Sequence, residues 1–389
     1  MKLLVALLLS VTMIAVPAFA ADLQLESGFG FTVQSGTWSY ENGELVSDAE
    51  KGKGAWLVSE KTFADFDLEL EFNTSTAFHV VVRGHTLPTG PVPEDKPVEI
   101  LPHSNYGYSI AADERSPHIE AGSADNPSSE LRFNEKLQSA WTTLRIQARG
   151  EIIEIEQNGK WETTLHSHAF TRGWLGFYLV HDQSRAGSVR IRNIEFTDHG
   201  HTGDWRTLFN GKDLDNWVEW GTETWTVKDG IIEGTSGPDK SEGYLATEET
   251  WSDFHVRGSF KILGDGNYGL FYHSSIAYND ENYPIISGIQ TEVAPGTPSP
   301  SGWLYESYKR GWLDAPDNSR PTAYALNEGE WNEIEVMSKG KRVTTWVNGI
   351  NVGNFSDDKP NYTKGAFALQ LHAGGAEGIL WKDLYVKEE

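Results

Sequence analysis

A pair of polar side chains, Gln290 and Glu292, stands in the otherwise mostly apolar stretch Gly288-Ile-Gln-Thr-Glu-Val293. If this stretch is a β-strand, its period of two puts the amide and the carboxyl on one face and the remaining side chains on the other. A carboxylate in this position could act as a base or hold a divalent metal ion, and an amide could bind hydroxyl groups. The alternative is that this face of the strand is simply solvated.

Two histidines are further candidates for a base, because the unperturbed pKa of histidine, about 6.5, lies near neutral pH. His372 follows alternating leucines, so we expect it on the face of Gln370, opposite the leucines. By the same alternation, His273 is expected to share a face with Phe271. The alternative for both is the commoner one, a structural histidine on a strand.

Tyr305, Glu306 and Arg310 form a polar cluster after a glycine turn, and Trp303 and Trp312 flank it. The tyrosine could transfer a proton, and the arginine could orient a hydroxyl group. The two tryptophans lie in a segment rich in Gly, Pro, Ser and Tyr, and their rings could stack on a sugar. The alternatives are a surface Arg–Glu pair, which contributes little, and tryptophans that belong to the core.

The elements that must position these residues occur twice in the chain. The spacing from Trp141 to Asn158-Gly159 equals that from Trp331 to Asn348-Gly349, and each copy reads as two alternating strands that lead into an Asn-Gly hairpin turn. Further segments match in the same order: 65–72 with 253–260, 78–83 with 268–273, 177–181 with 368–372, and 189–196 with 378–385. We interpret these matches as a duplication, with a polar, Gly-containing boundary near 198–203.

The hydrophobic pattern favours β-structure in both copies. Short alternating runs bounded by Gly, Asn, Asp and Pro recur, and no segment shows a long apolar period of 3.6. We therefore predict an all-β chain of two antiparallel sandwiches, over residues 21–200 and 204–389. The first copy lacks a Gln-x-Glu strand, and the spacing of its histidines matches no metal site, so we interpret it as a binding or spacer module.

The N-terminus and the composition restrict location and partners. Lys2, the apolar run 3–16 and the small-x-small cleavage site Ala18-Phe-Ala20 predict a signal peptide over residues 1–20, with export to the periplasm or beyond. No second apolar run follows, so we expect no membrane insertion. A net charge of −24 disfavours nucleic acid and anionic polysaccharides and favours neutral sugars or cations. The chain has no cysteine, which excludes disulfides and thiolate metal sites.

From residue 205 onward the chain resembles a known family. The opening Thr207-Leu-Phe-Asn-Gly-Lys-Asp-Leu-Asp-Asn-Trp217 is similar to that of the bacterial 3-keto-glycoside lyase/hydratase family, also called 3-keto-disaccharide hydrolase. Further matching segments are 225–233, 288–293, 302–306 with Arg310-Gly311, Trp331-Asn332, 346–349 and 369–372. The resemblance implies a concanavalin A-like jelly-roll fold for this half, in agreement with the strand pattern.

The resemblance also implies a reaction. Members of the family act on glycosides already oxidised to a ketone at carbon 3: a base removes the proton at carbon 2, the glycosidic oxygen leaves carbon 1, and water adds to the resulting enone. For this chain it implies the catalytic residues Glu292, His372, Tyr305 and Arg310. The implied substrate-binding residues are Gln290, Gln370, Glu306, His273, Trp303 and Trp312. A divalent metal ion, with Glu292 as a ligand, is an open possibility.

Two departures separate the chain from the family pattern. Many relatives have Arg where this chain has His273, and the Pro-rich segment 294–301 is longer than expected. A non-catalytic, lectin-like carbohydrate-binding protein is therefore the main alternative, because the same fold serves both functions. An ordinary glucanase ranks last, because the Glu-x-Asp-x-x-Glu strand typical of sandwich glucanases is absent.

Overall fold

The computed structural model describes residues 30–88, 100–102, 107–112, 118–123, 126–132, 141–375 and 377–389. In this part of the chain the one helical element is the short 3-10 turn η1 (Pro321–Tyr324), and everything else that is regular is β-structure. No helix of the described residues is long and apolar enough to cross a membrane. The predicted signal peptide, residues 1–20, lies outside the described residues.

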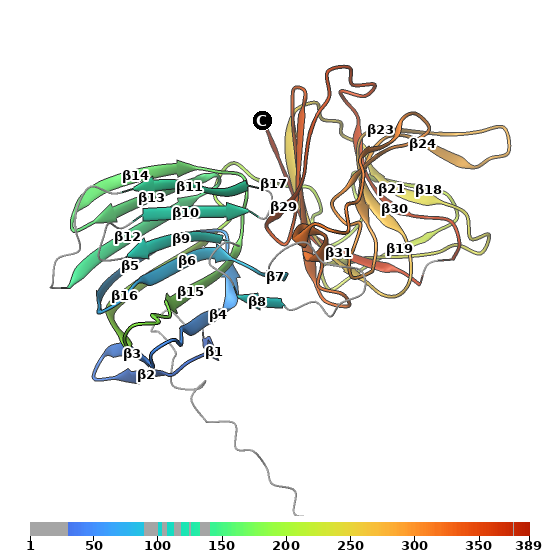
Figure 1. The fold of residues 1–389 in the computed structure, drawn as a ribbon. Coiled ribbons are helices and arrows are strands. Elements are labelled where there is room, and N and C mark those ends of the chain that lie inside the picture. The colour runs from blue at the N-terminus through green and yellow to red at the C-terminus, as the bar shows by residue number, and fades with distance from the viewer. Residues whose placement is uncertain are drawn as a thin grey trace, which may run out of the picture.

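Residues 31–200 form a sandwich of two seven-stranded antiparallel sheets (Figure 1). The sheet that we call the front sheet of the first domain has the order β1 (Phe31–Ser35), β4 (Ala55–Phe63), β15 (Gly173–Leu179), β6 (Phe78–Gly84), β9 (Gly107–Ala112), β10 (His118–Ser123) and β11 (Asn126–Arg132). Its back sheet has the order β2 (Trp38–Glu41), β3 (Glu44–Ala49), β16 (Gly187–Gly200), β5 (Asp65–Thr74), β12 (Thr142–Arg149), β13 (Ile152–Gln157) and β14 (Lys160–His166). A separate two-stranded ribbon joins β7 (Thr86–Pro88) to β8 (Ile100–Pro102).

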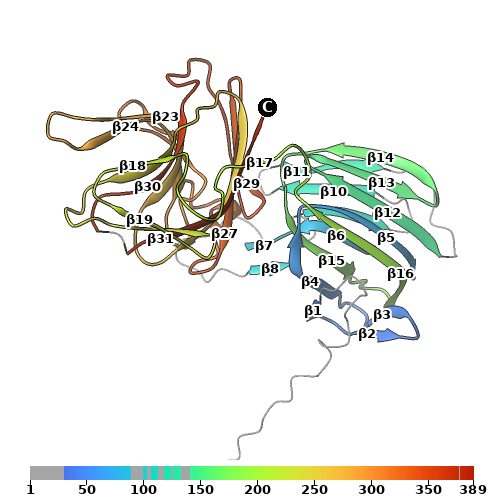
Figure 2. The same cartoon turned by 180° about the vertical axis from the view of Figure 1, so that it is seen from behind.

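Residues 206–388 form a second sandwich beside the first (Figures 1 and 2). Its front sheet has the order β18 (Trp217–Trp220), β21 (Gly243–Thr247), β30 (Ala366–Leu371), β23 (Tyr268–Tyr278), β24 (Pro284–Val293), β25 (Leu304–Glu306) and β26 (Gly311–Asp314). Its back sheet has the order β19 (Thr224–Lys228), β20 (Ile231–Thr235), β31 (Ile379–Glu388), β22 (Phe254–Ile262), β27 (Asn332–Lys339), β28 (Arg342–Val347) and β29 (Ile350–Ser356), and β17 (Arg206–Thr207) also pairs with β31.

The two sandwiches have the same topology, strand for strand. Each strand in the two seven-stranded sheets of the first domain has a counterpart at the same place in the corresponding sheet of the second. Left-handed residues recur at equivalent points as well: Asn42 and Asp229, Arg83 and His273, Asn158 and Asn348, and Asn193 and Asp383 all have φ between 48° and 53°. The chain thus consists of two tandem concanavalin A-like jelly-roll β-sandwiches, and the predicted fold class is confirmed.

Two of the sequence matches are out of register by one residue. The match of 177–181 with 368–372 paired His181 with His372 by residue type. In the structure Leu179 lies opposite Phe78, and Leu371 lies opposite Tyr268, the counterpart of Phe78. Strand pairing therefore aligns Leu179 with Leu371. The match of 189–196 with 378–385 needs the same correction of one residue. The alternation of buried side chains, which sets register, is a better guide here than residue type.

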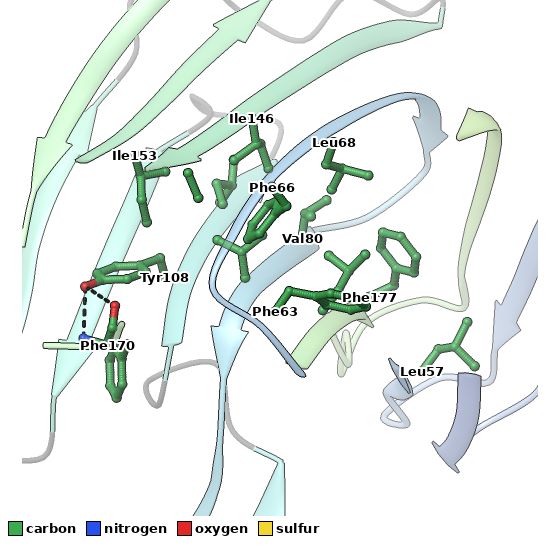
Figure 3. Packing of buried hydrophobic residues seen from close by; sticks show 14 of the residues in the cluster. Leu57, Phe63, Phe66, Leu68, Val80, Tyr108, Ile146, Ile153, Phe170 and Phe177 are labelled. Carbon is green, nitrogen blue, oxygen red and sulfur yellow. Dashed lines mark hydrogen bonds between the residues drawn. The ribbon is translucent and has the colours of Figure 1, made fainter. Parts of the chain in front are cut away.

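Each sandwich buries its own core between its sheets. In the first domain Leu57, Phe66, Leu68, Val80 and Phe177 pack in one cluster, as Figure 3 shows. At one end of this cluster the hydroxyl of Tyr108 accepts a hydrogen bond from the backbone N–H of Phe170, at 3.0 Å. The alternating pattern of the sequence produces this arrangement, because every second side chain of each strand reaches the core.

The segment around Phe170 joins the two domains. Phe170 forms an isolated antiparallel bridge with Ile350, and the N–H of Thr171 donates to the carbonyl of Gly349 at 2.9 Å. The indole N–H of Trp346 donates to the carbonyl of His168 at 2.6 Å. The core cluster of the first domain also includes residues of the second domain: Trp303, Ala325, Val347, Ile350 and Val352. The domains therefore share apolar packing as well as backbone hydrogen bonds.

Candidate functional site

The front sheet of the second domain has one face in the core and one that points away from it. Leu270, Ile289, Leu304 and Leu369 are buried in the core between the two sheets. The residues that alternate with them point outward. Strand pairing aligns the outward residues in two rows that cross the sheet. The first row is Tyr244, Gln370, Gly269 and Glu292. The second row is Ala246, Ala368, Phe271, Gln290, Tyr305 and Trp312.

Glu292 ends the first row as a nearly buried carboxyl group, 4% exposed. Burial raises the pKa of its side chain to about 7, although a hydrogen bond from the Asn267 amide and the nearby His372 both act to lower it. Burial has this effect because it penalises the charged form. Glu292 is therefore close to half ionised at neutral pH, which suits a group that takes up and returns a proton.

Two amide side chains lie next to this carboxyl and bind each other. The Nε2 of Gln290 donates to the Oε1 of Gln370 at 2.9 Å and to the carbonyl of Tyr268 at 3.2 Å. Gly269 leaves the space that Gln290 occupies, since a Cβ there would lie 2.5 Å from the Gln290 Nε2. The pair is held in place and nearly buried, with 5% of Gln290 and 3% of Gln370 exposed, and Gln370 also has a side-chain hydrogen bond with Tyr244. Amides are groups of the kind that bind sugar hydroxyls.

The sequence alone did not point to Tyr244, which begins the first row, or to Glu242, which lies beside it. The buried hydroxyl of Tyr244 donates to Glu242 at 2.6 Å, and the Nε2 of His372 lies 3.4 Å from the same carboxylate. Burial and the charge of Glu242 raise the pKa of Tyr244, so its phenol stays protonated. The sequence does show the spacing of two between Tyr244, in β21, and Glu242, which directly precedes that strand. The proximity of Glu242 to His372 depends on β21 pairing with β30, which no short motif signals.

Tyr305 and Trp312 end the second row. Tyr305 is half-buried opposite Gln290, and its ring meets that of Trp312 edge to face, with centroids 5.3 Å apart. Trp312 is 43% exposed, which is high for so large an apolar side chain. An exposed ring next to hydrogen-bonding amides has the geometry of a platform for a sugar ring.

The predicted cluster of Tyr305, Glu306 and Arg310 is divided between the two faces of the sheet. Glu306 pairs with Ile289 and so faces the core side, opposite to Tyr305. There Arg310 donates to both of its carboxylate oxygens, at 2.6 and 2.9 Å, and also to Asp357 at 2.6 Å. Although burial raises the pKa of Glu306, the hydrogen bonds from Arg310 lower it below its usual value. Arg310 and Glu306 thus bind each other within the fold, away from the outward rows.

The prediction that His273 shares a face with Phe271 is wrong. His273 has a φ of 48°, and the strand pairing is interrupted between Tyr272 and Ser275. This bulge turns the imidazole inward against Phe254, where its Nε2 lies 2.6 Å from the carbonyl of Ser252. Its counterpart Arg83 also binds a backbone carbonyl at the equivalent position, that of Ala64. Both residues hold the chain in place, and His273 does not reach the rows.

Trp303 is fully buried, with 0% of its surface exposed. It belongs to the apolar cluster shared with the first domain, and the guanidinium of Arg320 lies 5.4 Å from its ring centroid. No ring face is left for a sugar, so the prediction that it stacks on substrate is wrong. The sequence alone does not tell that Trp303 is buried and Trp312 exposed, because tertiary packing sets the turns that decide this.

The possible divalent metal ion finds no ligand set in the described part of the chain. Among these residues no three His, Cys, Asp or Glu side chains converge closely enough to hold an ion. Around Glu292 the neighbouring polar groups are the Asn267 amide, which binds it, and His372. A metal step therefore has no support from this donor set, and we derive none.

An all-β sandwich whose outward face carries a carboxyl, two amides and an exposed ring belongs to the class of carbohydrate-active proteins. Comparison with known families agrees. The model of the 3-keto-alpha-glucoside-1,2-lyase-like domain matches twice, over residues 26–197 and 204–387. The chain therefore belongs to this family, as the resemblance of its second half predicted, and the first half matches as well.

Individual relatives are more distant. A 3-keto-disaccharide hydrolase of Bacteroides thetaiotaomicron is 26% identical over 208 residues, which cover 43% of this chain and 69% of that protein. Among solved structures, a Bacillus subtilis protein with a galectin-like fold shares 14% identity at a TM-score of 0.37, covering 48% of this chain and 94% of its own. The carbohydrate-binding module CBM66, also of Bacillus subtilis, shares 15% identity at a TM-score of 0.33, covering 43% and 95%.

Proposed function

We propose that the second domain cleaves 3-keto-glycosides by elimination followed by hydration. The observation that carries this proposal is Glu292, a nearly buried carboxyl whose pKa is raised to about 7, on the same face of the sheet as two amides and the exposed ring of Trp312. The ketone at carbon 3 acidifies the proton at carbon 2, so a carboxylate of this basicity is suited to remove it. The match to the 3-keto-alpha-glucoside-1,2-lyase-like family supports the same substrate class.

In the first step Glu292 takes the proton from carbon 2. The electron pair of that C–H bond forms the double bond between carbons 1 and 2, and the bond from carbon 1 to the glycosidic oxygen breaks. Tyr305, the neighbour of Gln290 across the strands, supplies a proton to the leaving oxygen. The amides of Gln290 and Gln370 bind hydroxyls and the ketone oxygen, where negative charge develops.

In the second step water adds to the enone. Its oxygen bonds to carbon 1, one of its protons returns to Tyr305, and carbon 2 recovers a proton from Glu292. The net reaction is hydrolysis to a 3-keto sugar and an alcohol, and both side chains end in their starting state. His372, half-exposed beside Glu242, is placed to exchange the proton held by Glu292 with solvent before the hydration step, so that carbon 2 receives a solvent proton. Trp312 supports the sugar or its aglycone.

A single assay tests the proposal. The protein is incubated in deuterated water with 4-nitrophenyl 3-keto-β-glucoside and, separately, with the unoxidised glucoside, and aglycone release is followed. We expect release from the keto substrate alone, with deuterium at carbon 2 of the product. Glu292→Gln should lower kcat/KM at least ~100-fold, because it removes the base. Glu233→Gln, an exposed carboxyl on the back sheet, is the matched control and should leave the rate unchanged.

Three outcomes would count against the mechanism. Cleavage without deuterium at carbon 2 would exclude elimination, and cleavage of the unoxidised parent alone would point to an ordinary glycosidase. Binding of both glucosides with release from neither would favour the lectin-like alternative, for which the exposed ring of Trp312 and the paired amides are equally suited.

We also propose that the protein acts outside the cytoplasm, on the basis of the predicted signal peptide. N-terminal sequencing of protein recovered from the extracytoplasmic fraction should begin at Ala21. An intact Met1 in the cytoplasmic fraction would contradict this.

A further inference from the structure

The front sheet of the first domain carries the same two rows of outward positions as that of the second. Its first row, aligned by strand pairing with Tyr244, Gln370, Gly269 and Glu292, is Trp56, Tyr178, His79 and Ala111. Its second row, aligned with Ala246, Ala368, Phe271 and Gln290, is Val58, Gly176, Val81 and Ser109. The two domains can therefore be compared position by position.

Two positions of the first domain lack the polar groups that are proposed to act in the second. Alanine, Ala111, occupies the position of the Glu292 carboxyl, and Ser109 occupies that of the Gln290 amide. None of these eight positions of the first domain holds a carboxylic acid; its second row continues across β10 and β11 with Glu120 and Glu130, at the places of Tyr305 and Trp312. A base of the kind proposed for the second domain is therefore missing at these positions, and proton abstraction is not expected there.

The first row of the first domain carries three rings, Trp56, Tyr178 and His79, where that of the second domain carries Tyr244 alone. Trp56 stacks on Tyr178 with centroids 4.3 Å apart and ring planes 9° from parallel, and the edge of Trp174 meets Trp56 at 5.9 Å. His79 packs edge-on against Tyr178, and its Nδ1 lies 2.7 Å from the buried hydroxyl of Ser109. Trp56, Tyr178 and His79 are all partly exposed on the outward face. Ordered rings next to polar groups form a rigid, amphipathic surface.

From this arrangement we propose that the front sheet of the first domain is a second, non-catalytic binding site for a neutral pyranose. The C–H groups of a pyranose face pack on the negative faces of aromatic rings, while its hydroxyls bond to groups such as His79 and the Tyr178 phenol. The net charge of −24 repels anionic sugars, and none of the eight compared positions is Lys or Arg. Arg132, two strands beyond Ala111 in the first row, is accompanied by Glu120 and Glu130 in the second. The choice of a sugar as ligand rests on the proposed function of the second domain.

Binding can be measured with the second-domain site disabled. In the full mature chain, Gln290→Ala combined with Trp312→Ala removes an amide and the exposed ring of that site. Isothermal titration with cellobiose, maltose and laminaribiose should then detect one remaining site for at least one of these sugars. Adding Trp56→Ala should weaken its Kd at least ~10-fold, because it removes the stacking surface. His79→Ala, which leaves the stacked pair intact, should also weaken it.

The matched control is Tyr40→Ala, an exposed ring on the back sheet of the same domain, which should not change the Kd. Circular dichroism establishes that each variant is folded, and His79→Ala provides the test if Trp56→Ala does not fold. The proposal is overturned if none of the three sugars binds in the Gln290→Ala/Trp312→Ala background. It is also overturned if the Trp56→Ala or His79→Ala variant is folded and binds the sugar with the same Kd as the Gln290→Ala/Trp312→Ala protein. The sugars are unoxidised, so the result does not depend on whether the second domain cleaves keto-glycosides.

Discussion

At the scale of single residues, burial decides which polar groups are available for chemistry. Glu292 and Glu306 are both buried glutamates of the second domain's front sheet region. Arg310 and Asn361 satisfy the carboxylate of Glu306, whereas Glu292 has the neutral amide of Asn267 as its hydrogen-bond donor. Glu306 is therefore held as a structural anion, whereas Glu292 has a raised pKa.

The raised pKa of Glu292 predicts a pH-dependent stability. Its pKa is about 7 in the folded chain against an ordinary value of 4.5, so the folded state holds its proton more tightly than the unfolded state. The associated stability is fully present below about pH 4.5 and is lost as pH rises through about 7. Relative to Glu292→Gln, the wild-type protein should lose roughly 3 kcal/mol of unfolding free energy between about pH 4 and pH 8.

Urea denaturation of both proteins at several pH values measures this difference. The exposed Glu233→Gln variant should differ from the wild type by a constant amount over the same range. A flat difference for Glu292→Gln as well would mean that the carboxyl titrates normally in the folded protein.

Arg310 gives a second prediction at this scale. Arg310→Ala should lower the unfolding free energy by about 2 kcal/mol, because it leaves the buried Glu306 carboxylate without its cation. Arg190→Ala, which breaks the exposed pair with Glu44, should cost under about 1 kcal/mol. Denaturant titration checks both values. A large loss of kcat/KM for Arg310→Ala with unchanged stability would instead show that the guanidinium acts on substrate.

At the scale of elements, the sequence predicted strands and turns better than it predicted the site. Alternation and the two Asn-Gly turns sufficed for the sandwiches, and the same alternation placed Gln290 and Glu292 on one face. It failed at His273, where one left-handed residue reverses the face, and it could not show that Glu242 lies near His372. Bulges and pairings between strands distant in sequence depend on contacts that no local pattern encodes.

The two Asn-Gly turns provide a matched prediction. Asn158 and Asn348 have φ values of 50° and 52°, and their side chains accept a hydrogen bond from a backbone N–H of β12 and β27, respectively. Asn348 alone of the two also donates to the Ala325 carbonyl and to the Asn332 side chain, both at 2.8 Å. Asn348→Gly should therefore cost about 2 kcal/mol more than Asn158→Gly, since glycine adopts either turn and the two extra hydrogen bonds are lost.

Thermal and urea unfolding of the two variants give the comparison directly. Equal losses of stability would show that the bonds to Ala325 and Asn332 contribute nothing beyond the turn itself.

At the scale of the whole molecule, the two sandwiches are joined by a close backbone approach at Gly349. A Cβ on this residue would lie 2.5 Å from the carbonyl oxygen of Arg172 in the first domain. Gly159, at the same place in the first domain's turn, has a matching φ, +79° against +81°, but nothing within 4 Å of such a Cβ. The two glycines differ in their contact with the other domain and not in backbone conformation.

Alanine at the two positions should therefore have different consequences. Gly159→Ala should cost ~1–2 kcal/mol of backbone strain and leave a single thermal transition. Gly349→Ala adds a clash with the other domain, and we expect calorimetry to resolve two transitions and X-ray scattering to show a larger radius of gyration. One transition at the temperature of Gly159→Ala would contradict this account of the interface.

Trp303 links this interface to the proposed chemistry. Its ring is buried in the apolar cluster shared with the first domain, while its carbonyl accepts the N–H of Glu292 at 2.9 Å and the next strand carries Tyr305. A second domain expressed alone would expose this indole to water, and the backbone partner of Glu292 would lose its anchor. The two copies are thus no longer interchangeable or separable units: the half that has alanine at the position of Glu292 helps to hold the carboxyl of the other half in place.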